Sequence, residues 1–119
     1  MKPLRLMAAL LATCIAFDAY PHAFLHRAEP RVGSVVQVAP TELKLWFTEE
    51  IEPAFSTVKV LDAAGRQVDK GDAHVDASER ELLRVSLPSL PSGAYTVEWR
   101  VVSIDSHVST GGFAFRVRT

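Results

Sequence analysis

Hydrophobic and polar residues alternate in several short segments of this chain. The clearest segment is residues 41–48, where every second residue from Leu43 to Phe47 is apolar. A period of two residues is typical of a β-strand with one buried face. Further alternating or short apolar segments predict strands at residues 24–29, 35–38, 56–61, 83–87, 95–101 and 113–117. No segment beyond the N-terminal region has a helical period.

Turn-forming residues separate these segments at the spacing expected of a β-sandwich. Asp62 to Gly65 is a hairpin turn, and Leu90 to Tyr95 is a tight turn that resembles a tyrosine corner. Residues 70–81 are polar and predict a surface loop. Turns about every 8–12 residues between about seven short strands indicate an all-β fold. We expect a seven-stranded Greek-key β-sandwich of the immunoglobulin-like type.

The N-terminal segment has the pattern of an export signal. Lys2 and Arg5 precede an apolar core at residues 6–17, which is too short to span a membrane as a helix. Cleavage before His22 would divide the chain into a signal peptide at 1–21 and a mature domain at 22–119. A second possibility is a lipoprotein-type cut before Cys14. The two cuts would create different N-termini.

Composition narrows the class of protein. The chain has 119 residues, enough for one domain, and 13 basic residues against 14 acidic ones. This balance argues against nucleic-acid binding, which requires a basic surplus. The single cysteine lies in the predicted signal, so the mature domain has no disulfide. We therefore expect a domain that is exported to an oxidising compartment and stabilised by its core.

Asp105 and His107 are the first candidate functional residues. They are two positions apart where a strand passes into a polar turn, and two side chains at this spacing leave an extended backbone on the same side. If processing exposes His22, its α-amino group and its imidazole can chelate one metal ion. Three nitrogens and one carboxylate oxygen would suit Cu(II). The alternative interpretation is a turn-capping Asp and an exposed His.

A set of motifs extends along the whole mature chain. They are His22 to Leu25, Glu29-Pro30, Gly33-Ser34, Ala39-Pro40, Leu43 to Glu49, Gly93 to His107 and Phe113 to Val117. Together they resemble the CopC copper-resistance family over residues 22–118. Within this set, the run from Trp99 to His107 is the most specific.

The resemblance implies both a fold and a function. It implies a periplasmic β-sandwich of the cupredoxin-like or immunoglobulin-like type that binds one Cu(II) ion through His22, Asp105 and His107, with Glu49 as a carboxylate near the site. Such a protein would serve copper resistance by buffering the ion or delivering it to an inner-membrane transporter of the CopD type. It would be a binding protein and not an enzyme.

The chain also departs from some members of that family. A second, Cu(I) site in those members uses clustered methionines, but Met1 and Met7 both lie in the predicted signal. We therefore expect no Cu(I) site. His74 is expected to be an exposed loop residue. His26 follows His22 at an even spacing and is a candidate auxiliary ligand.

Two other functions remain open at this stage. A histidine chelate at the N-terminus also occurs in copper-dependent oxidative enzymes that cut polysaccharides. A structural β-sandwich with incidental histidines would bind no metal at all. Oxidase turnover and the effect of Cu(II) on thermal stability distinguish these possibilities.

Overall fold

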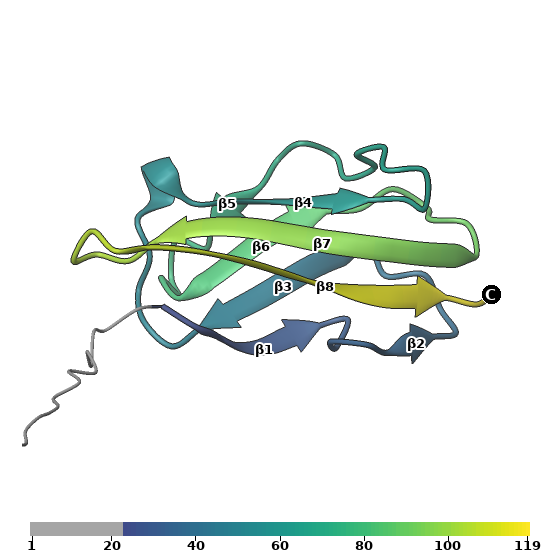
Figure 1. Ribbon diagram of the computed structural model, residues 1–119, viewed down its shortest axis with the longest axis horizontal. Coiled ribbons are helices and arrows are strands. Elements are labelled where there is room, and N and C mark those ends of the chain that lie inside the picture. The colour runs from purple at the N-terminus through teal and green to yellow at the C-terminus, as the bar shows by residue number, and fades with distance from the viewer. Residues whose placement is uncertain (1–22) are drawn as a thin grey trace, which may run out of the picture.

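Two four-stranded β-sheets packed face to face make up the structure (Figure 1). The computed structural model describes residues 23–119, so the predicted signal peptide and His22 lie outside the described residues. The strands are β1 Leu25–Glu29, β2 Val35–Val36, β3 Glu42–Phe47, β4 Thr57–Leu61, β5 His74–Val75, β6 Leu82–Ser86, β7 Gly93–Val102 and β8 Val108–Val117, and one short 3-10 helix, η1, spans Pro53–Phe55.

The strand order confirms the predicted β-sandwich. One sheet has the order β1-β3-β6-β5 and the other has the order β2-β8-β7-β4. Strands distant in sequence are therefore neighbours, as in a Greek key, and the strand pairs are antiparallel except for β2 with β8. Among the described residues, no helix is long and apolar enough to span a membrane.

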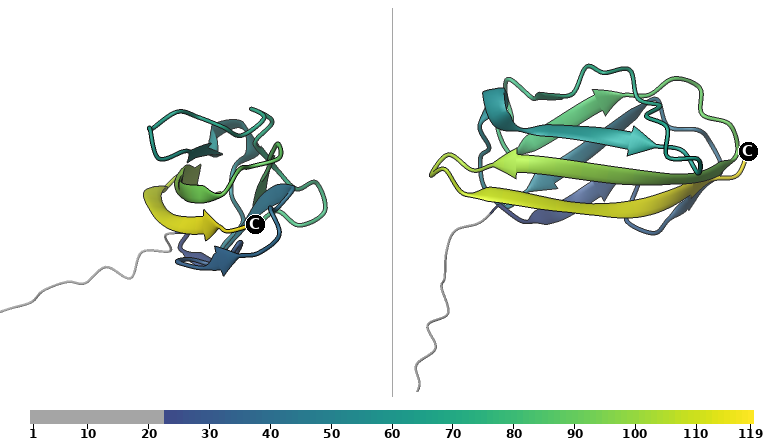
Figure 2. Two further views of the ribbon diagram at one scale, coloured as in Figure 1. Left: turned by 90° about the vertical axis from the view of Figure 1, so that its right-hand side faces the viewer. Right: turned by 45° about the horizontal axis from the view of Figure 1, so that its top comes forward.

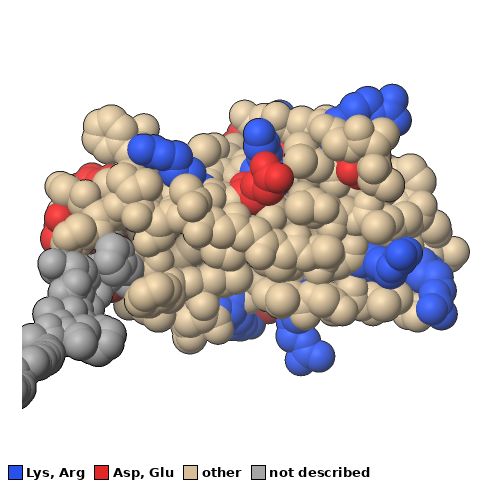
Figure 3. Space-filling model, viewed as in Figure 1, with Lys and Arg blue, Asp and Glu red and all other residues tan. Residues whose placement is uncertain are grey.

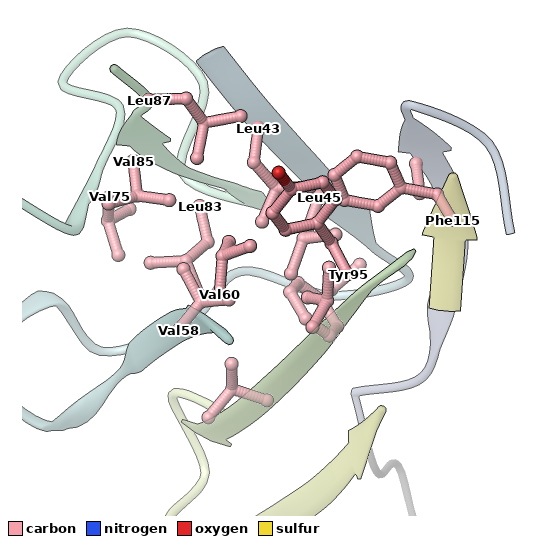
Figure 4. Close-up of a cluster of buried hydrophobic side chains, with 14 of the residues drawn as sticks. Leu43, Leu45, Val58, Val60, Val75, Leu83, Val85, Leu87, Tyr95 and Phe115 are labelled. Atoms are coloured by element: carbon pink, nitrogen blue, oxygen red, sulfur yellow. The ribbon is translucent and has the colours of Figure 1, made fainter. Parts of the chain in front are cut away.

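The core lies between the sheets and follows the alternation seen in the sequence. In β3, Leu43, Leu45 and Phe47 are at most 1% exposed, whereas the residues between them are partly exposed. Figure 4 shows leucine and valine side chains of β3 and β6 facing Tyr95, Phe115 and the valines of β4, which belong to the opposite sheet. Burial of these apolar side chains is the main force that holds the two sheets together.

The predicted tyrosine corner is present. The Tyr95 hydroxyl donates a hydrogen bond of 2.6 Å to the Pro91 carbonyl, and its ring stacks on Phe115. Burial raises the pKa of the Tyr95 hydroxyl, and the charge of Asp62 raises it further. The corner fixes the entry of the chain into β7, the strand that leads to the candidate site.

Two segments differ from the strand boundaries expected from the sequence. The polar segment 70–81 contains a short strand, β5, which pairs with β6, so the structure has eight strands when the two-residue β2 and β5 are counted. β8 begins at Val108, and Gly111 and Gly112 lie inside it. Gly111 lies inside the strand because it pairs with Trp99 of β7. The Trp99 ring occupies the space where a side chain at position 111 would lie.

The start of the described chain and the turn between β7 and β8 lie at the same end of the sandwich. Figures 1 and 2 show both near η1, with the C-terminus at the opposite end. Figure 3 shows acidic side chains at the end that carries this turn, and few charges over the middle of the face formed by β4, β7 and β8. The topology therefore places the turn with Asp105 and His107 at the same end as the start of the described chain.

Candidate metal centre

The turn between β7 and β8 carries both described candidate ligands. It is closed by hydrogen bonds from the Ser103 amide to the His107 carbonyl, 2.9 Å, and from the Ser106 amide to the Ser103 carbonyl, 2.8 Å. Ser106 has a φ of 75°, in the left-handed region. The turn is therefore compact and reverses the chain within five residues, 103–107.

The turn is held against the segment that follows β3. Ser103 and Ile51 form an antiparallel β-bridge. On either side of this bridge, the Glu52 amide donates to the Val102 carbonyl at 2.7 Å and the Ile104 amide donates to the Glu50 carbonyl at 3.3 Å. Ile51 is fully buried, so this contact fixes the turn to the core.

Asp105 and His107 come together, as the sequence predicted. Their Oδ1 and Nδ1 atoms lie 3.3 Å apart, and their side chains are 40% and 38% exposed. Two ligand atoms that each lie about 2.0–2.2 Å from one ion are about 3 Å from each other. This separation fits two donor atoms that face one ion, and it is equally that of a direct ion pair between the two side chains. The pair meets through the turn rather than through an extended strand, because both residues lie beyond the last residue of β7.

A serine that the sequence analysis did not select completes this arrangement. The Ser103 hydroxyl donates a hydrogen bond to Asp105 Oδ1 and accepts one of 3.2 Å from the His107 amide. The hydrogen bond that Ser103 donates lowers the pKa of the Asp105 carboxyl below its usual value, and the adjacent His107 lowers it further. The sequence did indicate that Ser103 faces inward, because the inward positions of β7 continue at a spacing of two from Val97 through Val101 to residue 103.

The remaining candidate residues do not join the pair. His26 lies where the register of β1 with β3 shifts, and its relation to His22 lies outside the described residues. His74 is exposed on β5, and its Nδ1 lies 2.8 Å from the Asp72 carbonyl. Glu49 precedes the bridge at Ile51. Within residues 23–119, no three His, Cys, Asp or Glu side chains gather into a set that could hold a metal.

The first described residues lie close to the start of β8. Ala23 is 1% exposed, and the Phe24 amide donates to the Thr48 hydroxyl at 3.0 Å. Ala23 and Phe24 line a small hollow together with Ser109 and Thr110, which follow His107 along β8. The position that precedes Ala23 belongs to His22, which lies outside the described residues.

Comparisons with known proteins agree with this architecture. The CopC domain family matches residues 25–118. The crystal structure of CopC from Methylosinus trichosporium OB3b is 35% identical, covers 81% of this chain and 93% of its own, and superposes with a TM-score of 0.72. The crystal structure of PcoC, a methionine-rich copper resistance protein from Escherichia coli, is 30% identical, covers 82% of this chain and 99% of its own, and gives a TM-score of 0.73.

A relative of known sequence extends the match over almost the whole chain. Protein YobA of Escherichia coli strain K12 is 32% identical over 119 residues, which is 98% of this chain and 96% of the relative. The two solved structures agree with the β-sandwich, and the family match and this relative extend the similarity along the chain. The chain therefore belongs to the CopC family.

Proposed function

We propose that the chain is an exported copper-binding protein that holds one Cu(II) ion in the periplasm. The ligands are the α-amino group and the imidazole of His22, together with Asp105 and His107. The observation that carries this proposal is the Asp105–His107 pair, with its donor atoms 3.3 Å apart, in a protein that shares its family with copper resistance proteins.

The position of Ala23 supports the inclusion of His22. Ala23 is buried, and the amide of its neighbour Phe24 donates to the Thr48 hydroxyl. The start of the described chain lies at the same end of the sandwich as the turn between β7 and β8 (Figure 1). A residue directly attached to Ala23 starts from a fixed point near β8. Export processing before His22 would place a free amine there, and a metal ion readily displaces its proton near neutral pH.

The donor set favours the oxidised form of copper. Imidazole and amine nitrogens with a carboxylate oxygen suit Cu(II), whereas Cu(I) prefers thioether and thiolate sulfur. Residues 22–119 contain no methionine and no cysteine. The proposed site is therefore specific for Cu(II).

The exposure of the pair supports a role in buffering or delivery. About two fifths of each of the Asp105 and His107 side chains is open to solvent. An ion held there remains within reach of a second protein. We propose a membrane copper transporter of the CopD type as the recipient. A bound carboxylate at Asp105 also fills a coordination position that an oxidative enzyme would keep open, so we propose binding rather than catalysis.

A titration of the mature protein tests the proposal. H107A should weaken Cu(II) binding by orders of magnitude in competition with a coloured chelator, whereas H74A should bind as the unaltered protein does. H74A is a matched control, because His74 is an exposed histidine on the short strand β5, in the sheet that does not contain β7 and β8. Equal affinities for the two variants would refute the proposed site.

Two further measurements distinguish copper binding from the two alternatives, a structural sandwich and an oxidative enzyme. Cu(II) should raise the unfolding temperature with increasing concentration, because the ion binds only the folded state. An incidental set of histidines would leave that temperature unchanged. With ascorbate and a polysaccharide, the copper-loaded protein should show no oxidative turnover.

A further inference from the structure

Ser103 is a buried polar residue at the base of the candidate site. Its side chain is fully buried, and among the described residues the other buried polar side chain is that of Ser56. Ser56 accepts a hydrogen bond from the amide of Val102, a residue of β7 that precedes the turn. A buried hydroxyl must form hydrogen bonds to offset the cost of removing it from water. The partners of Ser103 therefore show what it does.

Both hydrogen-bond partners of the Ser103 hydroxyl are candidate metal ligands, Asp105 and His107. A hydroxyl has one proton to donate and two lone pairs that accept. Ser103 donates its proton to Asp105 Oδ1 and accepts the His107 amide at 3.2 Å. One buried oxygen thus orients the carboxylate of one ligand and fixes the backbone of the other.

The oxygen itself is held in a fixed position. The Ser103 backbone forms the β-bridge with Ile51, and its amide donates to the His107 carbonyl at 2.9 Å. The hydrogen bonds of Glu52 and Ile104 on either side hold the same segment. The hydroxyl is consequently attached to the core, whereas the Asp105 and His107 side chains are substantially exposed.

We infer that Ser103 is a positioning residue for the copper site, which holds the Asp105 carboxylate and His107 in the arrangement that receives the ion. This inference rests on the proposed function. It predicts that the Ser103 hydroxyl contributes to copper affinity beyond its contribution to the fold. Without it, Asp105 can rotate away from His107, and the ion must order the pair when it binds.

The main test compares S103A with S56A in the mature protein. Each variant removes one buried serine hydroxyl, so each should lower the unfolding temperature of the copper-free protein. S103A should in addition weaken Cu(II) binding about tenfold, the effect expected from losing one charge-assisted hydrogen bond. Its Cu(II) electron paramagnetic resonance spectrum should change as well. S56A should keep the affinity and the spectrum of the unaltered protein.

If S103A is too unstable to measure, the variants S103T and S103V provide a second comparison with and without the hydroxyl. Threonine and valine have nearly the same shape, so S103T and S103V differ mainly in the hydroxyl. S103T should bind Cu(II) more tightly than S103V and retain the original spectrum. Equal affinity and equal spectra within this pair would overturn the inference, as would S103A with unaltered affinity.

H107A distinguishes the inference from the proposal on which it rests. If H107A loses copper while S103A keeps it, the site is correct and the positioning role is wrong. If H107A binds copper as the unaltered protein does, the proposed function itself fails. A double-mutant cycle of S103A and D105N measures whether the hydroxyl acts through the carboxylate, because coupled residues give non-additive losses.

Discussion

Trp99 and Gly111 face each other as register partners across β7 and β8, and the indole occupies the space above the glycine. A Cβ added at Gly111 would lie 2.4 Å from Cζ2 of Trp99. The ring cannot move aside easily, because it packs edge-on against Phe47 and at a tilt against Phe113. This glycine therefore allows β8, which follows the turn with Asp105 and His107, to lie close to β7.

G111A should destabilise the protein by about 2 kcal/mol, because a methyl group forced into a packed site displaces side chains or backbone. Chemical denaturation of the copper-free protein measures this loss. T110A, at the adjacent exposed position of β8, should remain within about 0.5 kcal/mol of the unaltered protein. Equal midpoints for the two variants would show that the strand yields to the added methyl.

Removal of the Tyr95 hydroxyl tests the corner that leads into β7. Y95F keeps the ring stacked on Phe115 but loses the 2.6 Å bond to the Pro91 carbonyl, and should cost about 1 kcal/mol. Y95A also loses the buried ring and should cost about 3–5 kcal/mol. Thermal unfolding of both variants checks this order, and a Y95F loss as large as that of Y95A would contradict it.

Stability at acid pH should depend on Asp76. Hydrogen bonds from the Ser78 hydroxyl and from Arg84 lower the pKa of its carboxyl from 3.8 to about 2 in the folded protein. The folded state therefore favours the charged form. This stabilisation is complete above the unfolded pKa of 3.8 and is lost as the pH falls toward 2. Urea midpoints of the copper-free protein, measured from pH 5 to pH 2, should fall less steeply in D76N; an identical fall would exclude this role.

An extra residue before His22 should abolish tight Cu(II) binding if the free amine is a ligand. A mature protein with one added glycine at its N-terminus keeps the His22 imidazole but moves the amine away from it. We expect an affinity loss of orders of magnitude in a competition titration. The matched control is one glycine added after Thr119, at the opposite end of the sandwich, which should leave the affinity unaltered. Retained affinity in the N-terminal variant would exclude amine coordination.

Reduction of the bound ion should release it. The mature chain has no sulfur ligand, and nitrogen and carboxylate donors hold Cu(I) weakly. On addition of ascorbate, a Cu(I)-specific chromophoric chelator should remove copper almost completely, whereas without ascorbate the protein should retain it as Cu(II). Cu(I) that the protein withholds from the chelator would reveal ligands outside the proposed set.

The sequence predicted the parts of the fold that depend on alternation. The buried faces of β3 and β7 could be read from every second residue, and the pair of Asp105 and His107 is local enough to be recognised by spacing. The glycines of β8 suggested that this strand starts later than it does, because the presence of Trp99 above Gly111 depends on pairing between two strands. Such a contact is not a property of either segment alone.

The candidate site was predictable only in part for the same reason. Ser103 follows the inward positions of β7, but its two hydrogen bonds depend on the left-handed conformation of Ser106, which reverses the chain. The shift in register at His26 also comes from pairing with β3 and cannot be read from residue spacing. His22 lies outside the described residues, so its part in the site stays a prediction.

The register shift of β1 at His26 also affects whether another copy of the protein could pair with this strand. β1 is the outer strand of its sheet, and an unpaired outer strand is a template on which another copy could add. The register shift interrupts its regular edge, and the exposed, mutually paired side chains of Arg27 and Glu29 add charge there. The other outer strand of this sheet, β5, has only two residues. Both edges of the sheet therefore resist the addition of a further strand, which protects the folded domain against aggregation.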